Sequence, residues 1–394
     1  MSVEVLNFGC RLNLAEGERI RALASGQSAT TIINSCGVTN EAVRQARQAV
    51  RRARRARPDA RVLVTGCAAQ LDPAAFAAMP EVSAVLDNRA KLDPMSYGST
   101  APKVERSPVV SGAAHARAFV EVQTGCDHSC TFCIIPQARG PSHSFPVDTI
   151  VATARAAVER GQQEVVLTGV DVTSYQGTLG TLVAAILRAV PALPRLRLSS
   201  LDPMEVDPLL FDLLAHEPRV MPHLHLSLQA GDDIILKRMK RRHLRADAIG
   251  LVERLKAQRP ELAIGADLIA GFPTETEAMF DNSLSILEEC DIVLPHIFPF
   301  SPRTGTPAAR MPLLPPALVR DRAARLREAA KARQTRWLTS LVGTQQTLLV
   351  ERDGVSGHAR NFARIVLEKP ASPDTLLAVR VTHQSGDALI GEPA

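Results

Sequence analysis

The sequence contains no apolar run of the ~18 residues that a transmembrane helix requires. Its first residues, Met1-Ser2-Val3-Glu4, also lack the positive charge with which a signal peptide begins. The 7 cysteines are odd in number, so they cannot all pair in a disulfide framework. These absences argue against a membrane-spanning protein and against a disulfide-stapled secreted domain. We therefore expect a cytoplasmic protein with no membrane partner.

The overall composition is that of a folded protein. Of the 394 residues, 45% are hydrophobic and 22% are charged, which excludes extensive disorder. At roughly 100–200 residues per domain, this length predicts two or three domains. In a reducing compartment the cysteines are available for metal ligation, catalysis or burial, and their positions must decide among these roles.

The formal net charge of +5 is unevenly distributed along the chain. Residues 1–112 hold 15 Lys or Arg and 10 Asp or Glu, whereas the rest of the chain is neutral. The excess lies mainly in residues 41–57, where alanines and valines recur at helical spacing and leave the arginines on the opposite face. That face is either solvated or a phosphate-binding surface, with Arg51, Arg52 and Arg55 as candidate nucleic-acid contacts.

Three cysteines near the N-terminus each follow a predicted strand. The strands at 3–8, 30–34 and 61–65 alternate with predicted helices, which indicates a parallel sheet. Because parallel strands lie ~4.8 Å apart and end at a common edge, the thiols that follow them can converge. These cysteines are Cys10, Cys36 and Cys67. They are either unrelated core residues or the ligands of a metal centre with one open position.

A second group of three cysteines lies in one loop, Gly125-Cys-Asp-His-Ser-Cys-Thr-Phe-Cys133, after a predicted strand at 119–123. Its members are Cys126, Cys130 and Cys133. A structural zinc site normally has four ligands, and His128 is the candidate fourth. Alternatively, three thiolates on a [4Fe-4S] cluster leave one iron free for another ligand. The seventh cysteine, Cys290, has no such neighbour and is interpreted as structural.

The spacing Cys-x3-Cys-x2-Cys after a first barrel strand resembles the cluster loop of radical S-adenosylmethionine (SAM) enzymes. The longer stretch 124–140 resembles the methylthiotransferase branch, whose N-terminal domain carries a second three-cysteine cluster. The resemblance implies two [4Fe-4S] clusters, with SAM as both radical source and methyl donor. It also implies that the loop cluster generates the radical. The N-terminal cluster would hold a sulfur species that a second SAM methylates before transfer.

The middle of the chain continues the alternation of strands and helices. Six parallel strands, a partial (β/α)6 barrel, are predicted at 119–123, 164–168, 195–200, 223–229, 263–269 and 293–298. The resemblance implies that SAM contacts lie at the carboxyl ends of these strands. The residues in those positions are Thr168, Gly169, Ser227, Gln229, Asp267 and Gly271.

The C-terminal segment follows a proline-rich break and a predicted helix at 317–341. Its short strands suit a small antiparallel β-barrel and resemble the TRAM domain of methylthiotransferases, with Arg360 and Arg364 as RNA contacts. The expected α/β chain thus has three domains. They are a parallel α/β sheet domain that carries the auxiliary cluster (1–112), a radical SAM barrel (113–335) and a TRAM-like RNA-binding barrel (336–394).

Four stretches look most like the branch that modifies threonylcarbamoyladenosine in tRNA. They are residues 34–42, 65–70, 167–175 and 198–203. This resemblance implies an enzyme that methylthiolates C2 of N6-threonylcarbamoyladenosine at position 37 of tRNA. Its partners would be that tRNA and an electron donor such as flavodoxin or ferredoxin.

Three alternatives stay open on the sequence alone. Other branches of the family act on isopentenyladenosine in tRNA or on an aspartate of a ribosomal protein. From a different class, the chain could be a non-catalytic RNA-binding protein stabilised by zinc. The sequence indicates no catalytic residue beyond the cluster ligands, and no oligomeric state.

Overall fold

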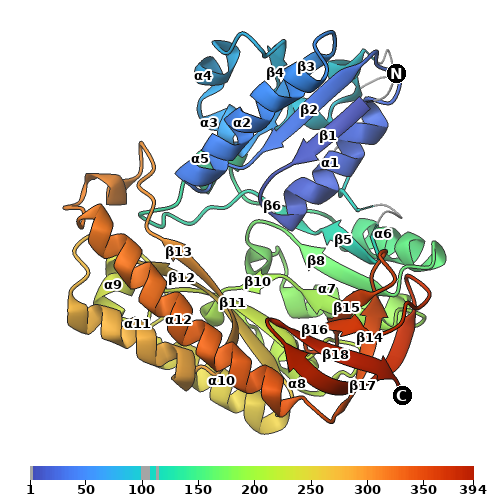
Figure 1. Ribbon diagram of the computed structural model, residues 1–394, viewed down its shortest axis with the longest axis vertical. Coiled ribbons are helices and arrows are strands. Elements are labelled where there is room, and N and C mark those ends of the chain that lie inside the picture. The colour runs from blue at the N-terminus through green and yellow to red at the C-terminus, as the bar shows by residue number, and fades with distance from the viewer. Residues whose placement is uncertain (1–2, 99–106, 112–114) are drawn as a thin grey trace.

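The computed structural model describes residues 3–98, 107–111 and 115–394. An N-terminal sheet domain lies above a central open barrel, and a small C-terminal barrel lies beside the central one (Figure 1). This arrangement confirms the predicted fold class. Within the described residues, no helix combines the length and the apolarity needed to cross a bilayer.

The N-terminal domain is a parallel sheet covered on both faces. Its strand order is β1-β2-β3-β4. The strands are β1 (Val3–Asn7), β2 (Thr30–Ser35), β3 (Arg61–Gly66) and β4 (Ala84–Val85). All six residues of β2 are buried, as expected for a central strand between two helical layers.

Different helices cover the two faces of this sheet. One face packs against α1 and η2, and the opposite face packs against α2, α3 and α4. The elements are α1 (Arg11–Leu23), α2 (Asn40–Ala56), α3 (Cys67–Leu71), α4 (Pro73–Ala77), η1 (Ala90–Leu92) and η2 (Pro94–Tyr97). The helix α3 was not predicted, because its five residues are too few to show a helical period.

The central domain contains the six predicted parallel strands in chain order. They form two hydrogen-bonded groups, β5-β8-β9 and β10-β11-β12-β13, because the third strand is interrupted at Ser199. The strands are β5 (Arg117–Glu121), β8 (Glu164–Thr168), β9 (Arg195–Leu198), β10 (Ser200–Leu201), β11 (His223–Gln229), β12 (Ala263–Ala270) and β13 (Ile292–Pro299).

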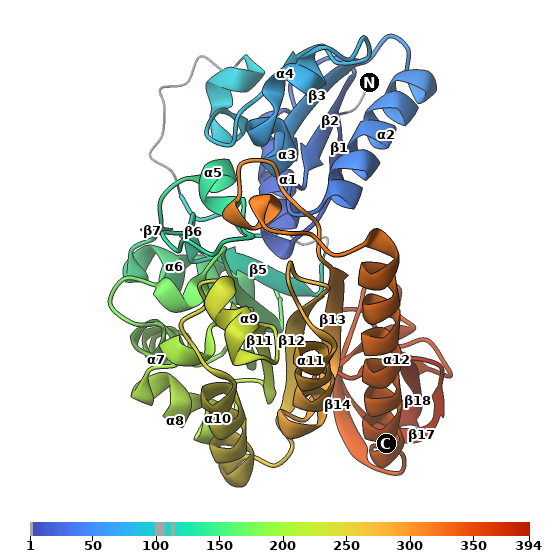
Figure 2. The same cartoon turned by 90° about the vertical axis from the view of Figure 1, so that its left-hand side faces the viewer.

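Helices cover the outer face of the central barrel (Figure 2). They are α6 (Val147–Glu159), α7 (Leu179–Ala189), α8 (Pro208–His216), α9 (Asp233–Arg238), α10 (Arg245–Gln258) and α11 (Glu277–Glu289). The smaller elements are β6 (Gln123–Thr124), α5 (Ile135–Arg139), β7 (His143–Ser144), η3 (Val172–Ser174), η4 (Pro203–Glu205) and η5 (Pro307–Arg310).

Side chains alternate between the two faces of the central strands. Leu196 and Leu198 on β9 belong to the large apolar core under the helices. Arg195 and Arg197 alternate with these leucines, face the opposite way and are nevertheless buried, at 2% and 1% exposure. The barrel therefore has an apolar exterior under its helices and a charged interior.

The C-terminal barrel is closed, in the order β14-β15-β16-β18-β17. Its strands are β14 (Gln345–Val350), β15 (Ser356–Ala359), β16 (Arg364–Leu367), β17 (Leu376–Ser385) and β18 (Ala388–Pro393). The pairing is antiparallel except between β16 and β18, which run parallel where the sheet closes. The small C-terminal barrel is therefore confirmed, with one parallel pair of strands at its seam.

The long helix α12 (Pro316–Ser340) connects the central domain to the C-terminal barrel. The expected domain boundary at 335/336 falls inside this helix. The other expected boundary, at 112/113, lies outside the described residues. The domain limits stay predictions.

Candidate active site

The three N-terminal cysteines lie at one edge of the parallel sheet. Cys10 is the N-cap of α1, Cys36 follows β2, and Cys67 is the first residue of α3. The Cys10 loop comes very close to Cys36, since a Cβ added to Gly9 would lie 2.7 Å from the Cys36 Sγ. Gly9 also has φ +91°, so this position requires glycine.

Burial and the neighbouring thiols oppose ionisation of Cys36. Burial raises the pKa of the Cys36 thiol to about 11, and the charges of Cys10 and Cys67 raise it further. Thiolates that destabilise one another need a bound cation to coexist. The three cysteines can hold a metal centre because they meet at one edge of the sheet, and Cys10 is the exposed member of the group.

The second group of cysteines is held by backbone contacts to distant segments. Gly125 has φ +72°, and a Cβ there would lie 1.9 Å from the Pro141 carbonyl oxygen, so glycine is required. The amide of Cys126 donates to Gly140 O at 3.1 Å, and the amide of Thr131 donates to Met239 O at 3.1 Å. The loop is thus fixed to the barrel on both sides of Cys130.

Burial also opposes the ionisation of two thiols of this loop, Cys126 and Cys133. Burial raises the pKa of Cys126 to about 12, and Asp171 and the other two thiols add to this shift. Burial raises the pKa of Cys133 to about 11. Cys130 Sγ accepts a hydrogen bond from Arg241 Nη1 at 3.6 Å, and such donors stabilise a thiolate on a metal centre.

The donor geometry favours a multi-iron cluster over a single ion. Among the described residues, neither triad has all three of its sulfurs within 4.8 Å of one another. A single zinc ion would hold its sulfurs closer than this, since each Zn–S bond is about 2.3 Å. A cubane of iron and sulfide separates its three thiolates more widely and fits the triads better.

His128 is engaged by carboxylates. Its Nε2 lies 2.8 Å from Asp171 Oδ2 and 3.8 Å from Glu205 Oε1. Hydrogen bonds to Asp171 and Glu205 raise the pKa of His128 to about 10, so the ring is protonated near neutral pH. Ligand atoms of His128, Cys126 and Asp171 also lie within 4.8 Å of one another, so these three residues form a group that could hold a metal ion.

A buried charge network connects the two cysteine triads. Arg139 ends α5, directly after the second triad, and its Nη1 donates to Glu16 Oε1 at 3.0 Å. Lys91 Nζ donates to the other oxygen of Glu16 at 2.7 Å. Burial lowers the pKa of Arg139, but Glu16 and then Cys67 and Cys10 raise it well above its ordinary value, so this guanidinium lies close to the first triad.

Removal of Arg139 is expected to destabilise the contact between the two domains. The Arg139 side chain is 4% exposed, so Arg139→Ala leaves Glu16 with Lys91 alone in a buried site. Breaking a buried ionic network of this kind costs about 3–5 kcal/mol. Calorimetry should show the first unfolding transition at lower temperature. The exposed Arg188→Ala on α7 is the control and should shift stability by less than about 0.5 kcal/mol.

The residues predicted to contact SAM lie in different surroundings. Thr168 ends β8, and Gly169 leaves no room for a side chain beside Gln123 O. Asp267 on β12 accepts hydrogen bonds from His225 Nε2 at 3.1 Å and His296 Nδ1 at 3.2 Å. Burial raises the pKa of the Asp267 carboxyl, but these two histidines hold it well below its usual range.

Three further predicted SAM contacts lie at the ends of β11 and β12. Ser227 uses its carbonyl to accept from Arg241 Nη2 at 2.7 Å, and Gln229 has a left-handed φ of +73°. Gly271 is buried against α12, where an added Cβ would lie 2.9 Å from Val319. Its immediate surroundings are therefore protein side chains.

The predicted RNA contacts fall into two separate groups. Arg51, Arg52 and Arg55 are exposed on the outer face of α2, in the N-terminal domain. Arg364 is exposed on β16, whereas Arg360 donates to Pro218 O at 2.7 Å and faces the central barrel. The structure does not bring the two groups together (Figure 1).

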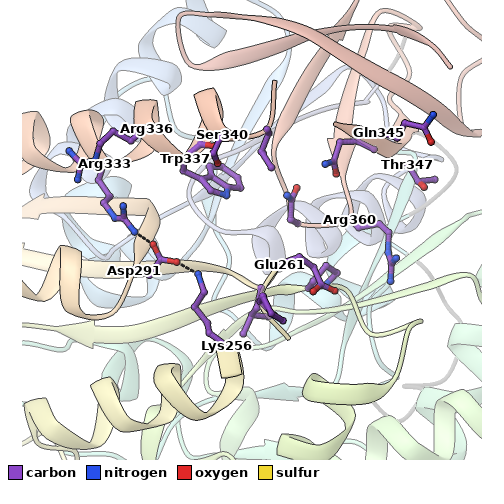
Figure 3. A pocket seen from close by; sticks show the side chains of 16 residues that line it. Lys256, Glu261, Asp291, Arg333, Arg336, Trp337, Ser340, Gln345, Thr347 and Arg360 are labelled. Carbon is purple, nitrogen blue, oxygen red and sulfur yellow. Dashed lines mark hydrogen bonds and ion pairs between the residues drawn. The ribbon is translucent and has the colours of Figure 1, made fainter. Parts of the chain in front are cut away.

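A cavity of about 640 Å³ lies at the amino ends of β11, β12 and β13, whereas Cys126 to Cys133 follow the carboxyl end of β5. Figure 3 shows the side chains that line this cavity. It is enclosed by α12, by the C-terminal barrel and by the segments that precede β11, β12 and β13. Asp291 lies between Lys256 and Arg333 in its wall and forms an ion pair with each. Its distance from both triads separates this cavity from the candidate active site.

The charged interior of the barrel was missed in the sequence. Arg197 Nε pairs with Glu164 Oε1 at 2.7 Å, and Arg195 Nη1 lies 3.8 Å from Glu164 Oε2. Burial lowers the pKa of Arg11 to about 10, with Arg117 and Arg197 adding to the effect. The alternation Arg195-Leu-Arg-Leu198 was the available signal, because it places two charges on one face of a buried strand.

Two parts of the chain match the sequence models of known families. Residues 120–287 match the radical SAM superfamily, and residues 2–87 match a family described as "Uncharacterized protein family UPF0004". Each match covers one of the cysteine triads.

Curated proteins resemble the chain over nearly its whole length. It is 44% identical over 385 residues to the threonylcarbamoyladenosine tRNA methylthiotransferase MtaB of Rickettsia prowazekii, covering 93% of this chain and 91% of that protein. The protein of the same name from Thermotoga maritima is 32% identical, with 89% and 86% covered. A tRNA-2-methylthio-N(6)-dimethylallyladenosine synthase of Cereibacter sphaeroides is 31% identical, with 98% and 97% covered.

Solved structures share the fold at low sequence identity. The radical SAM methyltransferase TsrM from Kitasatospora setae, with cobalamin and a [4Fe-4S] cluster bound, matches with a TM-score of 0.52 and 14% identity. The match covers 74% of this chain and 68% of that one. At this identity the likeness concerns the fold alone.

Proposed function

The chain belongs to the radical SAM tRNA methylthiotransferase family, and from this premise we propose that it methylthiolates C2 of N6-threonylcarbamoyladenosine at position 37 of tRNA. The observation that carries the proposal is the 44% identity, over 93% of the chain, to a protein named for this substrate. Membership of the radical SAM family implies a [4Fe-4S] cluster and SAM. The 31% identity to a tRNA-2-methylthio-N(6)-dimethylallyladenosine synthase supports dimethylallyladenosine as the second candidate substrate.

We assign one cluster to each cysteine triad. Cys126, Cys130 and Cys133 would hold the cluster that binds SAM, and Cys10, Cys36 and Cys67 would hold a second [4Fe-4S] cluster. When bound, these groups supply the reductive cleavage of SAM and the sulfur that is transferred. The position of the first triad at the ends of neighbouring parallel strands supports this assignment. Each triad also has sulfurs too far apart for one zinc ion to bind all three.

The protein's own residues would set the electrostatics around each cluster. The Arg241 guanidinium donates a hydrogen bond to Cys130 Sγ. Beside the first triad, the two positive charges of Arg139 and Lys91 exceed the one negative charge of Glu16. Positive charge and donors near cluster sulfurs raise a reduction potential. Both effects favour electron acceptance from a donor such as flavodoxin or ferredoxin.

The remaining predicted contacts are part of the same proposal. Thr168, Gly169, Ser227, Gln229, Asp267 and Gly271 would shape the SAM site at the carboxyl ends of the strands. The tRNA backbone would meet the exposed arginines of α2, and the C-terminal barrel would add contacts near Arg360 and Arg364.

Nucleoside analysis of tRNA from a strain lacking this gene tests the proposed substrate. We expect the methylthio form of threonylcarbamoyladenosine to disappear and the unmodified nucleoside to accumulate. Loss of the methylthio form of dimethylallyladenosine instead would support the second candidate. A complementing copy of the gene should restore the wild-type profile.

A further inference from the structure

The Arg11 guanidinium lies in the barrel interior without an acceptor. Arg11 follows Cys10 directly, and its Cζ lies 5.9 Å from the Phe119 ring centroid and 5.4 Å from the Phe362 ring centroid. Within the part of the chain that the structure describes, it donates no hydrogen bond and forms no ion pair. A part-buried cation whose guanidinium has no hydrogen-bond acceptor is incompletely compensated.

A second guanidinium beside it also has an unused donor. Arg197 is fully buried and pairs with Glu164 through Nε and Nη2, but its Nη1 has no hydrogen-bond partner in the described structure. Arg117 pairs with Glu351 of the C-terminal barrel. Arg195 Nη1 also lies 3.8 Å from Glu164 Oε2, so Arg195 and Arg197 share this one carboxylate.

Phe362 of the C-terminal barrel holds these cations in place. Its ring centroid lies 4.8 Å from Arg197 Cζ and 4.5 Å from the stacked ring of His358. The ring of His223, the first residue of β11, lies on it at 4.8 Å. Phe362 adopts φ +70°, a conformation that a non-glycine residue keeps only under strong packing constraint. The C-terminal barrel thus closes the amino end of the central barrel beneath Arg11.

We propose that Arg11 and Arg197 form a subsite for the carboxylate of the substrate's threonylcarbamoyl group. This inference rests on the proposed function and explains how the chain distinguishes its base. The threonylcarbamoyl group carries a carboxylate, whereas a dimethylallyl group is uncharged. A guanidinium binds a carboxylate through paired, charge-assisted hydrogen bonds, which would satisfy both the Arg11 donors and Arg197 Nη1.

The position of Arg11 and Arg197 inside the barrel limits which carboxylates or phosphates can reach them. Arg11 contacts Phe119 in the middle of β5 and the ring of Phe362 at the amino end of the barrel. The loop from Cys126 to Cys133 follows β5 at its carboxyl end, and SAM would be held at that end of the barrel. An RNA backbone cannot enter a barrel interior, but the extended substituent of a single base can.

The test compares Arg11→Gln with wild type on three anticodon stem-loop RNAs. The first carries threonylcarbamoyladenosine, the second carries the same base with the carboxylate replaced by a carboxamide, and the third carries unmodified adenosine. Binding is measured at equilibrium without SAM, and kcat/KM is measured with it. We expect wild type to prefer the carboxylate over the carboxamide by about 10- to 100-fold, and Arg11→Gln to lose most of that preference.

Two further variants control the experiment. Arg19→Gln changes an exposed arginine of the same helix and should keep the wild-type preference. Arg11→Lys keeps the charge and should retain part of the preference, while iron content and melting temperature report whether each variant folds.

Several results would overturn the subsite. If Arg11→Gln keeps the wild-type preference for the carboxylate over the carboxamide, Arg11 does not bind the carboxylate. A raised KM for SAM alone would assign the arginine to SAM's own carboxylate. An equal loss of affinity for all three RNAs would assign it to a phosphate. If wild type prefers the carboxylate in binding but methylthiolates none of the RNAs, the proposed reaction fails while the subsite stands.

Discussion

Cys130→Ala is expected to abolish both methylthiolation and the reductive cleavage of SAM. Cys130 is the central cysteine of the loop and accepts from Arg241, so its loss leaves two thiols where three must hold a cluster. With two [4Fe-4S] clusters, iron should fall from about eight to about four atoms per chain. The measurements are iron content after anaerobic reconstitution and the amount of 5′-deoxyadenosine released under reductant.

Cys290→Ala is the matched control for this experiment. Cys290 is fully buried in the large apolar core of the central barrel and belongs to neither triad. Its replacement should leave about eight iron atoms and normal SAM cleavage, with a loss of stability of about 1 kcal/mol. If Cys130→Ala cleaves SAM as fast as the wild type does, the SAM-binding cluster is not held by this loop.

Cys36→Ala is expected to separate the two halves of the reaction. The side chain is 8% exposed and lies between the Cys10 loop and Cys67, so its removal should empty the N-terminal site. Iron should again fall to about four atoms per chain. SAM cleavage should continue at the intact loop site, while the methylthio product falls to background because no sulfur source is bound.

The pattern across the two variants is more informative than either alone. Cys130→Ala should lose cleavage and product together, whereas Cys36→Ala should lose the product only. If wild type holds about four iron atoms and Cys36→Ala changes neither iron nor product, the chain has a single cluster.

The two triads could be predicted from the sequence because local rules determine them. The loop cysteines are close in the chain, and Cys10, Cys36 and Cys67 each follow a strand of a parallel sheet. Parallel strands in chain order bring their carboxyl ends to one edge, so their convergence follows from topology. The six-stranded barrel followed from the same alternation of strands and helices.

The barrel interior could not be predicted, because its contacts join distant segments. Arg11 and Phe362 meet although they belong to the first and last domains. No local pattern reports such a contact. The sequence predicted RNA contacts at Arg360 and Arg364. Between them, Phe362 packs its ring among Arg11, Arg117 and Arg197. The packing of Gly271 on Val319 of α12 is another contact between distant segments.

The central claim is tested most directly by one competition assay. Reconstituted protein, SAM, a sulfide source and reductant are incubated anaerobically with two tRNAs, one carrying threonylcarbamoyladenosine and one carrying dimethylallyladenosine, and the nucleosides are analysed by mass spectrometry. The account predicts that threonylcarbamoyladenosine alone gains the mass of one CH2S unit, as a methylthio group replaces the hydrogen at C2. Modification of dimethylallyladenosine instead, or of neither base by protein that holds both clusters, would contradict it.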